Sequence, residues 1–199
     1  MRLYLILLIV FLFISGCAQQ ITDDKGIYSD WKSRINKQNT WKANGKIAFI
    51  NTNERQSANF TWKNNGDKHT PNFKLKLTTF IGTQILSVSQ EKNKAQLDYD
   101  GKTYFDTSAQ NMLNRLTNIS FPVSDAPSWL KGRPKSNNIK FDDLDRVQSA
   151  RIQDNKGEFW HVTYNQYAQT DGFWLPRKMS LVNRDLKIKM QIHSWQITQ

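Results

Sequence analysis

Residues 72–86 read NFKLKLTTFIGTQIL, a strand-like run, a turn and the start of a second strand-like run. In the first run, three apolar residues alternate with two lysines. Successive side chains of a strand point to opposite faces, so this period of two predicts a strand with one apolar and one solvated face.

The same alternation recurs elsewhere in the chain. It is found in SANFTW (57–62) and in LKIKMQIH (186–193). Turn signals separate such runs, at NNGD (64–67), YDGK (99–102) and DNKG (154–157). Many short alternating strands with close turns predict an antiparallel sheet that curls or closes.

Helical patterns are few. They are confined to SDWKSRINKQNTW (29–41), DTSAQNMLNRLTN (106–118) and the short SDAPSWLKG (124–132). We expect the pieces between strand blocks to cover one face of the curved sheet. The chain contains no internal repeat or sign of a second domain, so residues 31–199 are predicted to form one domain.

The turn inside residues 77–86 is unusual, because Phe80 and Ile81 stand directly before Gly82. Turns in soluble proteins normally carry small or polar residues. One interpretation folds both side chains back onto the core beside a bulge at Gly82, and the residues alone favour it. The other leaves both side chains in solvent.

The amino terminus carries an export signal. Arg2 precedes the twelve-residue apolar run 3–14, which is shorter than the ~20 residues of a spanning helix and is typical of a secretory signal peptide. Residues 14–17, ISGC, resemble a bacterial lipobox, in which the cysteine is acylated after cleavage. We therefore expect a signal peptide at 1–16 and a lipidated tether at 17–30. An ordinary signal peptide with an incidental cysteine is the alternative.

Two features of this segment have further consequences. Cys17 is the only cysteine, so an intramolecular disulfide is excluded. Bacterial lipoproteins with Asp after the lipidated cysteine stay in the inner membrane, whereas this chain has Ala18. The resemblance thus implies lipid anchoring through Cys17 in the outer membrane, facing the periplasm.

The formal net charge of the whole chain is +11. In a cytosolic protein such a charge would suggest nucleic acid as a partner, but export argues against it. A solvated basic surface facing anionic lipid head groups or an acidic partner is the expectation.

No catalytic or cofactor-binding pattern stands out. The three histidines, at 69, 161 and 193, are scattered, and HExxH, GxSxG and phosphate-binding glycine loops are missing from the sequence. The acidic DDLD (142–145) lies beside Lys140 and Arg146 and is more typical of a solvated turn than of a catalytic carboxylate pair. We expect binding or transport rather than catalysis, with no metal and no cofactor.

Several segments of the chain stand in a characteristic order. They are WKANGKIAF (41–49), SANFTW (57–62), FKLKLTTFIGTQILSV (73–88), QNMLNRLTNISFPVSDAPSWLKGRP (110–134), VTYNQY (162–167), LPRKMSL (175–181) and KIKMQIHSW (187–195). Their order resembles the LolB family of outer-membrane lipoprotein receptors. No single segment is specific, but the set covers nearly all of the mature chain. One departure is Ala126, where the family has a larger aliphatic residue.

The resemblance implies a mostly β fold, an incomplete antiparallel β-barrel with a few short helices covering an apolar cavity. It implies a monomeric receptor that accepts triacylated lipoproteins from the periplasmic carrier LolA and inserts them into the outer membrane. Basic residues expected near the mouth of this cavity, Lys74, Lys76 or Arg133, are candidates for docking an acidic surface of the carrier. For the cavity that holds the cargo's acyl chains, one strand face supplies the candidate wall: Phe60, Trp62, Phe73, Leu75, Leu77, Leu97, Tyr99, Ile188, Met190 and Ile192.

The resemblance also gives the turn a role. In the family this loop exposes a leucine needed to insert cargo into the membrane, and Ile81 takes its position. Phe80 stands where the family has proline, which makes the loop less rigid but adds an aromatic side chain suited to the membrane interface. The competing functions are a scaffolding lipoprotein with a solid core and a hydrolase of envelope glycan.

Overall fold

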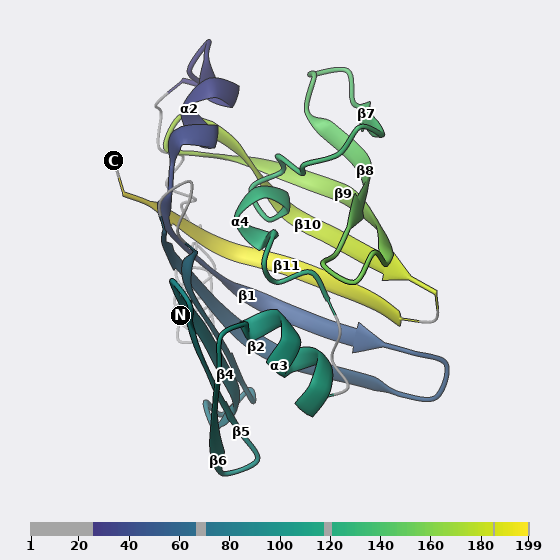
Figure 1. The fold of residues 1–199 in the computed structure, drawn as a ribbon. Coiled ribbons are helices and arrows are strands. Elements are labelled where there is room, and N and C mark those ends of the chain that lie inside the picture. Colours follow the sequence, from purple (N-terminus) through teal and green to yellow (C-terminus); the bar gives the residue numbers. More distant parts are fainter. Residues whose placement is uncertain (1–25, 67–70, 118–120, 185, 199) are drawn as a thin grey trace, which may run out of the picture.

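The computed structural model describes residues 26–66, 71–117, 121–184 and 186–198, and eleven of its strands form one sheet (Figure 1). The signal peptide and Cys17 lie outside the described residues. The strands are β1 Thr40–Ile50, β2 Arg55–Asn65, β3 Asn72–Thr78, β4 Gln84–Glu91, β5 Lys94–Tyr99, β6 Lys102–Asp106, β7 Ile139–Phe141, β8 Val147–Gln153, β9 Phe159–Thr170, β10 Phe173–Asn183 and β11 Leu186–Ile197.

The strand order explains how the sheet is built. It runs β6-β5-β4-β3-β2-β1-β11-β10-β9-β8-β7, and every neighbouring pair is antiparallel. Each half is a series of hairpins, and the first and last strands join the halves, for example through Ile47 opposite Met190. Strands β6 and β7 end the order, so the sheet stays open. The predicted incomplete antiparallel barrel is confirmed.

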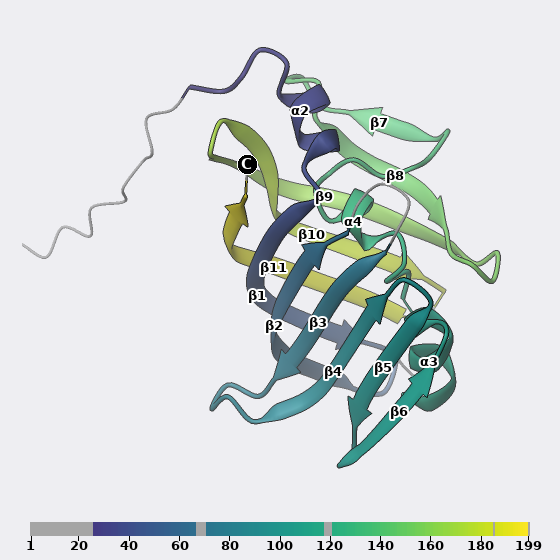
Figure 2. The ribbon, with the colours of Figure 1, turned by 60° about the vertical axis from the view of Figure 1, so that its left-hand side comes forward.

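Short helices cover the inner face of the curved sheet (Figures 1 and 2). The connector between β6 and β7, described at 107–117 and 121–138, carries α3 (Ala109–Leu116) and α4 (Ala126–Trp129). In α3, Ser108 caps the first turn by accepting a hydrogen bond from Asn111 N, at 3.3 Å. Helix α4 ends at Trp129, and just beyond it Gly132 adopts a φ of +74°, a conformation that favours glycine.

Glycine is also needed in the centre of the sheet, at Gly45 of β1. The register between β1 and β11 shifts there, because Asn44 faces Ser194 while Gly45 faces Ile192. A Cβ atom at Gly45 would lie 2.1 Å from the carbonyl oxygen of Gln191, which is far inside van der Waals contact. The missing side chain thus allows the two strands to approach at the bulge.

The amino-terminal helix α2 (Trp31–Lys37) packs against one end of the sheet, where Trp31 and Ile35 form a small second core with Phe173 and Leu175. Residues before the helix join this core. Tyr28 N donates a hydrogen bond to Gly172 O at 3.0 Å, and the Tyr28 ring meets Phe173 edge-on. The last residues of the predicted tether therefore lie on the domain. None of the helices in the described parts of the chain has the length and apolar character to cross a membrane.

Candidate functional site

The turn between β3 and β4 carries two adjacent, strongly exposed apolar side chains, including the most exposed large one among the described residues. Phe80 is 91% exposed and Ile81 is 73% exposed. Of the two interpretations given by the sequence, the structure has the one with both side chains in solvent. Exposing such side chains to water forgoes roughly 1.5–3 kcal/mol each.

Hydrogen bonds hold the base of this turn. Thr79 N donates to Thr83 O at 2.8 Å, and Thr83 N donates in return to the Thr79 side-chain oxygen at 3.1 Å. Gly82 N donates to Thr79 O, and the Gly82 φ of +92° is a conformation that favours glycine. Asn59 of β2 adds a side-chain bond to Thr79 O at 3.2 Å. Polar contacts therefore fix the base of the turn, and Phe80 and Ile81 form its exposed apolar tip.

The ten residues proposed to line an acyl-chain cavity share the inner face of the sheet. Nine are at most 3% exposed, and Tyr99 is half-buried and packs on the same cluster. Period-two alternation therefore placed their side chains on the correct face. The nine buried residues are Phe60, Trp62, Phe73, Leu75, Leu77, Leu97, Ile188, Met190 and Ile192.

The space in front of these residues is occupied by aromatic side chains of the connector. Trp62 meets Phe121 and Trp129 edge-on, with ring centroids 6.3 Å and 6.0 Å apart, and Phe121 also meets Phe49. Trp129 is fixed in turn, because its indole N–H donates to Pro122 O at 2.8 Å and its carbonyl accepts from the Tyr164 hydroxyl at 2.6 Å. The connector aromatics therefore pack directly against the inner face of the sheet at Trp62.

Two indole N–H groups in this interior lack a hydrogen-bond partner within the described chain, those of Trp41 and Trp62. Leaving a buried donor unsatisfied costs about 1–3 kcal/mol. Trp62 is fully buried on the inner face of β2, against the connector. Its N–H is therefore a donor available to an acceptor that enters the interior.

Helix α2 and the end of α4 are joined by a buried cation. The Lys131 side chain is 4% exposed, and its amine donates to Ile35 O at 2.9 Å and to Gln38 O at 2.6 Å. Burial lowers the pKa of Lys131 to about 8. The carbonyl oxygens at the end of α2 thus bind the amine of Lys131, a residue that was not among the candidates from the sequence.

The three basic residues suggested for carrier docking do not lie together. Lys74 and Lys76 project from the outer face of β3, opposite the buried Leu75, so their expected position near the mouth is wrong. The sequence pattern already contained this result, because these lysines alternate with core residues. Arg133 follows α4 and donates to the Asn36 side chain at 3.2 Å.

In the acidic turn at 142–145, Asp142 is engaged by hydrogen bonds and an ion pair within the turn. Asp142 accepts hydrogen bonds from the backbone N–H groups of Leu144 and Arg146, and it pairs with the Arg146 guanidinium at 2.8 Å. Across the residues whose positions are given, no group of three or more His, Cys, Asp or Glu side chains is arranged to hold a metal ion. His69 lies outside the described residues.

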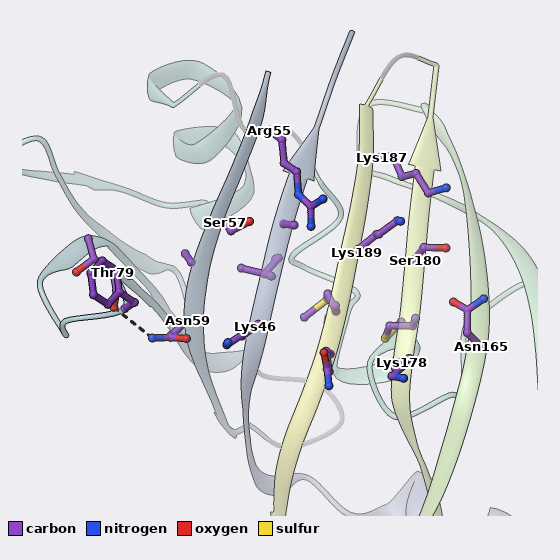
Figure 3. Close-up of a pocket in the computed structure, with 17 residues that line it drawn as sticks. Lys46, Arg55, Ser57, Asn59, Thr79, Asn165, Lys178, Ser180, Lys187 and Lys189 are labelled. Carbon is purple, nitrogen blue, oxygen red and sulfur yellow. Dashed lines mark hydrogen bonds between the residues drawn. The ribbon is translucent and has the colours of Figure 1, made fainter. Parts of the chain in front are cut away.

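A groove that was not expected from the sequence lies on the outer face of the sheet (Figure 3). It crosses β1, β2, β10 and β11, reaches Thr79 and Phe80, and has a volume of about 810 Å³. In the sequence, this groove is indicated by the lysines that alternate with the apolar residues of β11. Its charged lining residues are Lys46, Arg55, Lys178, Lys187 and Lys189.

The chain is similar to known proteins in sequence and in fold. The family model described as outer membrane lipoprotein LolB matches residues 39–195. Outer-membrane lipoprotein LolB of Pseudoalteromonas translucida is 44% identical over 195 residues, which span 98% of this chain and 95% of that relative. The protein of the same name from Psychromonas ingrahamii is 33% identical over 199 residues, spanning 98% and 96%.

A solved structure has a related backbone. The LolA superfamily protein of Nitrosomonas europaea superposes with a TM-score of 0.57, covering 85% of this chain and 94% of that protein. The sequence identity is 8%, so this likeness concerns the fold alone.

Proposed function

The chain belongs to the LolB family of outer membrane lipoproteins, which act in lipoprotein localisation, and on this premise we propose that it is a receptor for lipoproteins in transit. It accepts a triacylated lipoprotein from the soluble carrier LolA and inserts it into the outer membrane. Cys17 remains the predicted lipidation site that anchors the receptor.

The observation that carries the proposal is the exposed pair Phe80 and Ile81 on a hydrogen-bonded turn. Burial of an apolar side chain in hydrocarbon recovers the free energy that its exposure to water forgoes. Two such side chains on one projecting turn therefore favour contact with the lipid bilayer, where the cargo is released.

In this proposal, the acyl chains of the cargo bind on the inner face of the sheet. Because the connector aromatics fill this space, cargo binding requires Trp129 and Phe121 to move away from Trp62. Contacts with the acyl chains then replace the apolar contacts made by the connector aromatics. An ester or amide carbonyl of the lipid can accept a hydrogen bond from the unpaired Trp62 N–H.

Transfer of this kind runs down an affinity gradient. Each 1.4 kcal/mol of preference is about a tenfold ratio of affinities, and each buried CH₂ group contributes about 0.8 kcal/mol. An interior that buries a few more methylene groups than the carrier does is therefore sufficient to make the handover favourable.

The test is a transfer assay with radiolabelled lipoprotein bound to purified carrier. The mature chain carrying Cys17→Ala is compared with versions that also carry Ile81→Asp or Phe105→Asp. Phe105 is the matched control, because it is 74% exposed but lies on β6, away from the turn. We expect Ile81→Asp to accept cargo but to lose at least tenfold in insertion into membranes, and Phe105→Asp to behave like the parent.

The alternative is a scaffolding lipoprotein with a solid core, which the packing of the connector aromatics on the inner face favours. If the parent protein takes no cargo from the carrier and binds no apolar fluorescent dye at stoichiometric concentration, the receptor proposal is wrong and this alternative replaces it.

A further inference from the structure

The outer-face groove collects five cationic side chains from four strands, two near each end of the chain. Lys46 of β1 and Lys178 of β10 both pair in register with Gln191 of β11, so they flank that strand on the same face. Lys187 and Lys189 follow along β11 at alternate positions, and Arg55 begins β2 (Figure 3). All five side chains are exposed.

These cations are not neutralised by the protein. The lining of the groove includes no aspartate or glutamate. Within the described residues, none of the five takes part in an ion pair or a side-chain hydrogen bond. The floor between them consists of small or neutral side chains, such as Ala48, Ser57 and Ser180. The groove is thus open to anions and carries a concentrated positive potential.

Phe80 connects this groove with the apolar tip of the β3–β4 turn. It is a lining residue of the groove and at the same time the most exposed aromatic side chain among the described residues. The cations and the apolar tip therefore face the same space. A basic face bordered by apolar side chains is typical of proteins that bind in the interface of anionic membranes.

We propose that the groove binds the phosphate groups of anionic membrane lipids and holds the outer face of β1, β2, β10 and β11 against the membrane. This orientation gives the β3–β4 turn its direction into the bilayer. It also leaves the connector-covered inner face free for the incoming carrier. The proposal deepens the proposed function, since it rests on the turn entering lipid.

The test compares two double variants with the same change of net charge, in the mature chain carrying Cys17→Ala so that the acyl anchor does not mask the contact. Lys187→Gln/Lys189→Gln removes two cations from the groove, whereas Lys74→Gln/Lys76→Gln removes two from the outer face of β3. Sedimentation with phosphatidylethanolamine–phosphatidylglycerol vesicles measures binding, and phosphatidylcholine vesicles serve as the neutral reference.

We expect the groove variant to lose about tenfold or more in affinity for the anionic vesicles and to show a weaker dependence on salt. The β3 variant should change less than threefold. Equal losses in the two variants would overturn the proposal, because total charge rather than the groove would then determine binding. Unchanged binding in the groove variant would overturn it as well.

Loading from the carrier separates this inference from the receptor proposal. The groove variant should still accept cargo from LolA. If it binds vesicles normally but fails to take cargo, the groove docks an acidic protein and the lipid assignment is wrong. If the parent binds anionic vesicles through the groove but takes no cargo, the lipid assignment stands and the receptor proposal fails.

Discussion

At the scale of single residues, Lys131 shows how burial changes a titratable group. Its amine is buried and donates hydrogen bonds to two carbonyls at the end of α2. A positive charge is favourable at a helix carboxyl end, but the loss of hydration is larger and lowers the pKa of Lys131 to about 8.

This pKa predicts a pH-dependent stability. Because the folded-state pKa of about 8 lies below the ordinary value of 10.5, the unfolded chain binds the Lys131 proton more tightly. The burial penalty is thus fully present below pH 8 and is relieved as the pH rises from 8 to 10.5. The difference in pKa corresponds to about 3 kcal/mol at most.

Denaturant unfolding of the protein and of Lys131→Met at pH 7, 8.5 and 10 measures this effect. We expect the free energy of unfolding of the parent to rise relative to that of the variant across this range, since other titrating groups cancel in the difference. A difference that is independent of pH would show that the amine is solvated in the folded protein.

At the scale of elements, helix α4 is held over the sheet by few polar contacts. Its carbonyl at Trp129 accepts the Tyr164 hydroxyl from β9 at 2.6 Å. Burial raises the pKa of Tyr164, so the hydroxyl keeps its proton and remains a donor. The contact is thus a latch between the connector and the sheet.

Replacement Tyr164→Phe should loosen this latch. Loss of one hydrogen bond with retention of the ring costs about 1 kcal/mol, which corresponds to an approximately fivefold larger population of open molecules. We expect faster uptake of an apolar fluorescent dye, measured by stopped-flow fluorescence, together with a small loss of stability.

Tyr167→Phe is the control, because the Tyr167 hydroxyl donates to Val147 O of β8 and not to α4. Equal rates of dye uptake for the two variants would show that α4 is not the part of the connector that opens.

At the scale of the whole molecule, the open sheet distributes its stability unevenly. Strands β1 and β11 lie at its centre and have partners on both sides, whereas β6 and β7 have one partner each in the strand order. Strand β7 is also short, with three residues, Ile139–Phe141, so few of its amide groups can form hydrogen bonds with a neighbouring strand. Local opening is easier where fewer hydrogen bonds must break.

Hydrogen exchange followed by mass spectrometry should therefore show slow exchange in β1 and β11 and faster exchange in β6 and β7. The expected difference is at least tenfold in rate. Equal protection of the edge strands would indicate that they are paired, for example with a second copy of the chain, and would contradict the expectation of a monomer.

Much of the fold was accessible from the sequence, because its main signal is local. The alternation in NFKLKLT and LKIKMQIH assigned Leu75, Ile188 and Met190 to the inner face, as the structure has them. The same period assigned Lys74 to the outer face, although the sequence analysis placed it near the mouth. Helix α3 was expected within residues 106–118, and the structure has it at Ala109–Leu116.

The sequence by itself thus determined the strands, their two faces and the turns, because a period of two and a glycine-containing turn are properties of neighbouring residues. Only the tertiary structure decided which strands are neighbours and whether the β3–β4 turn folds back. The pairing of β1 with β11 brings Lys46 beside Gln191, and this contact between the two ends of the chain creates the basic groove. Such pairing depends on packing across the whole sheet, which no local pattern contains.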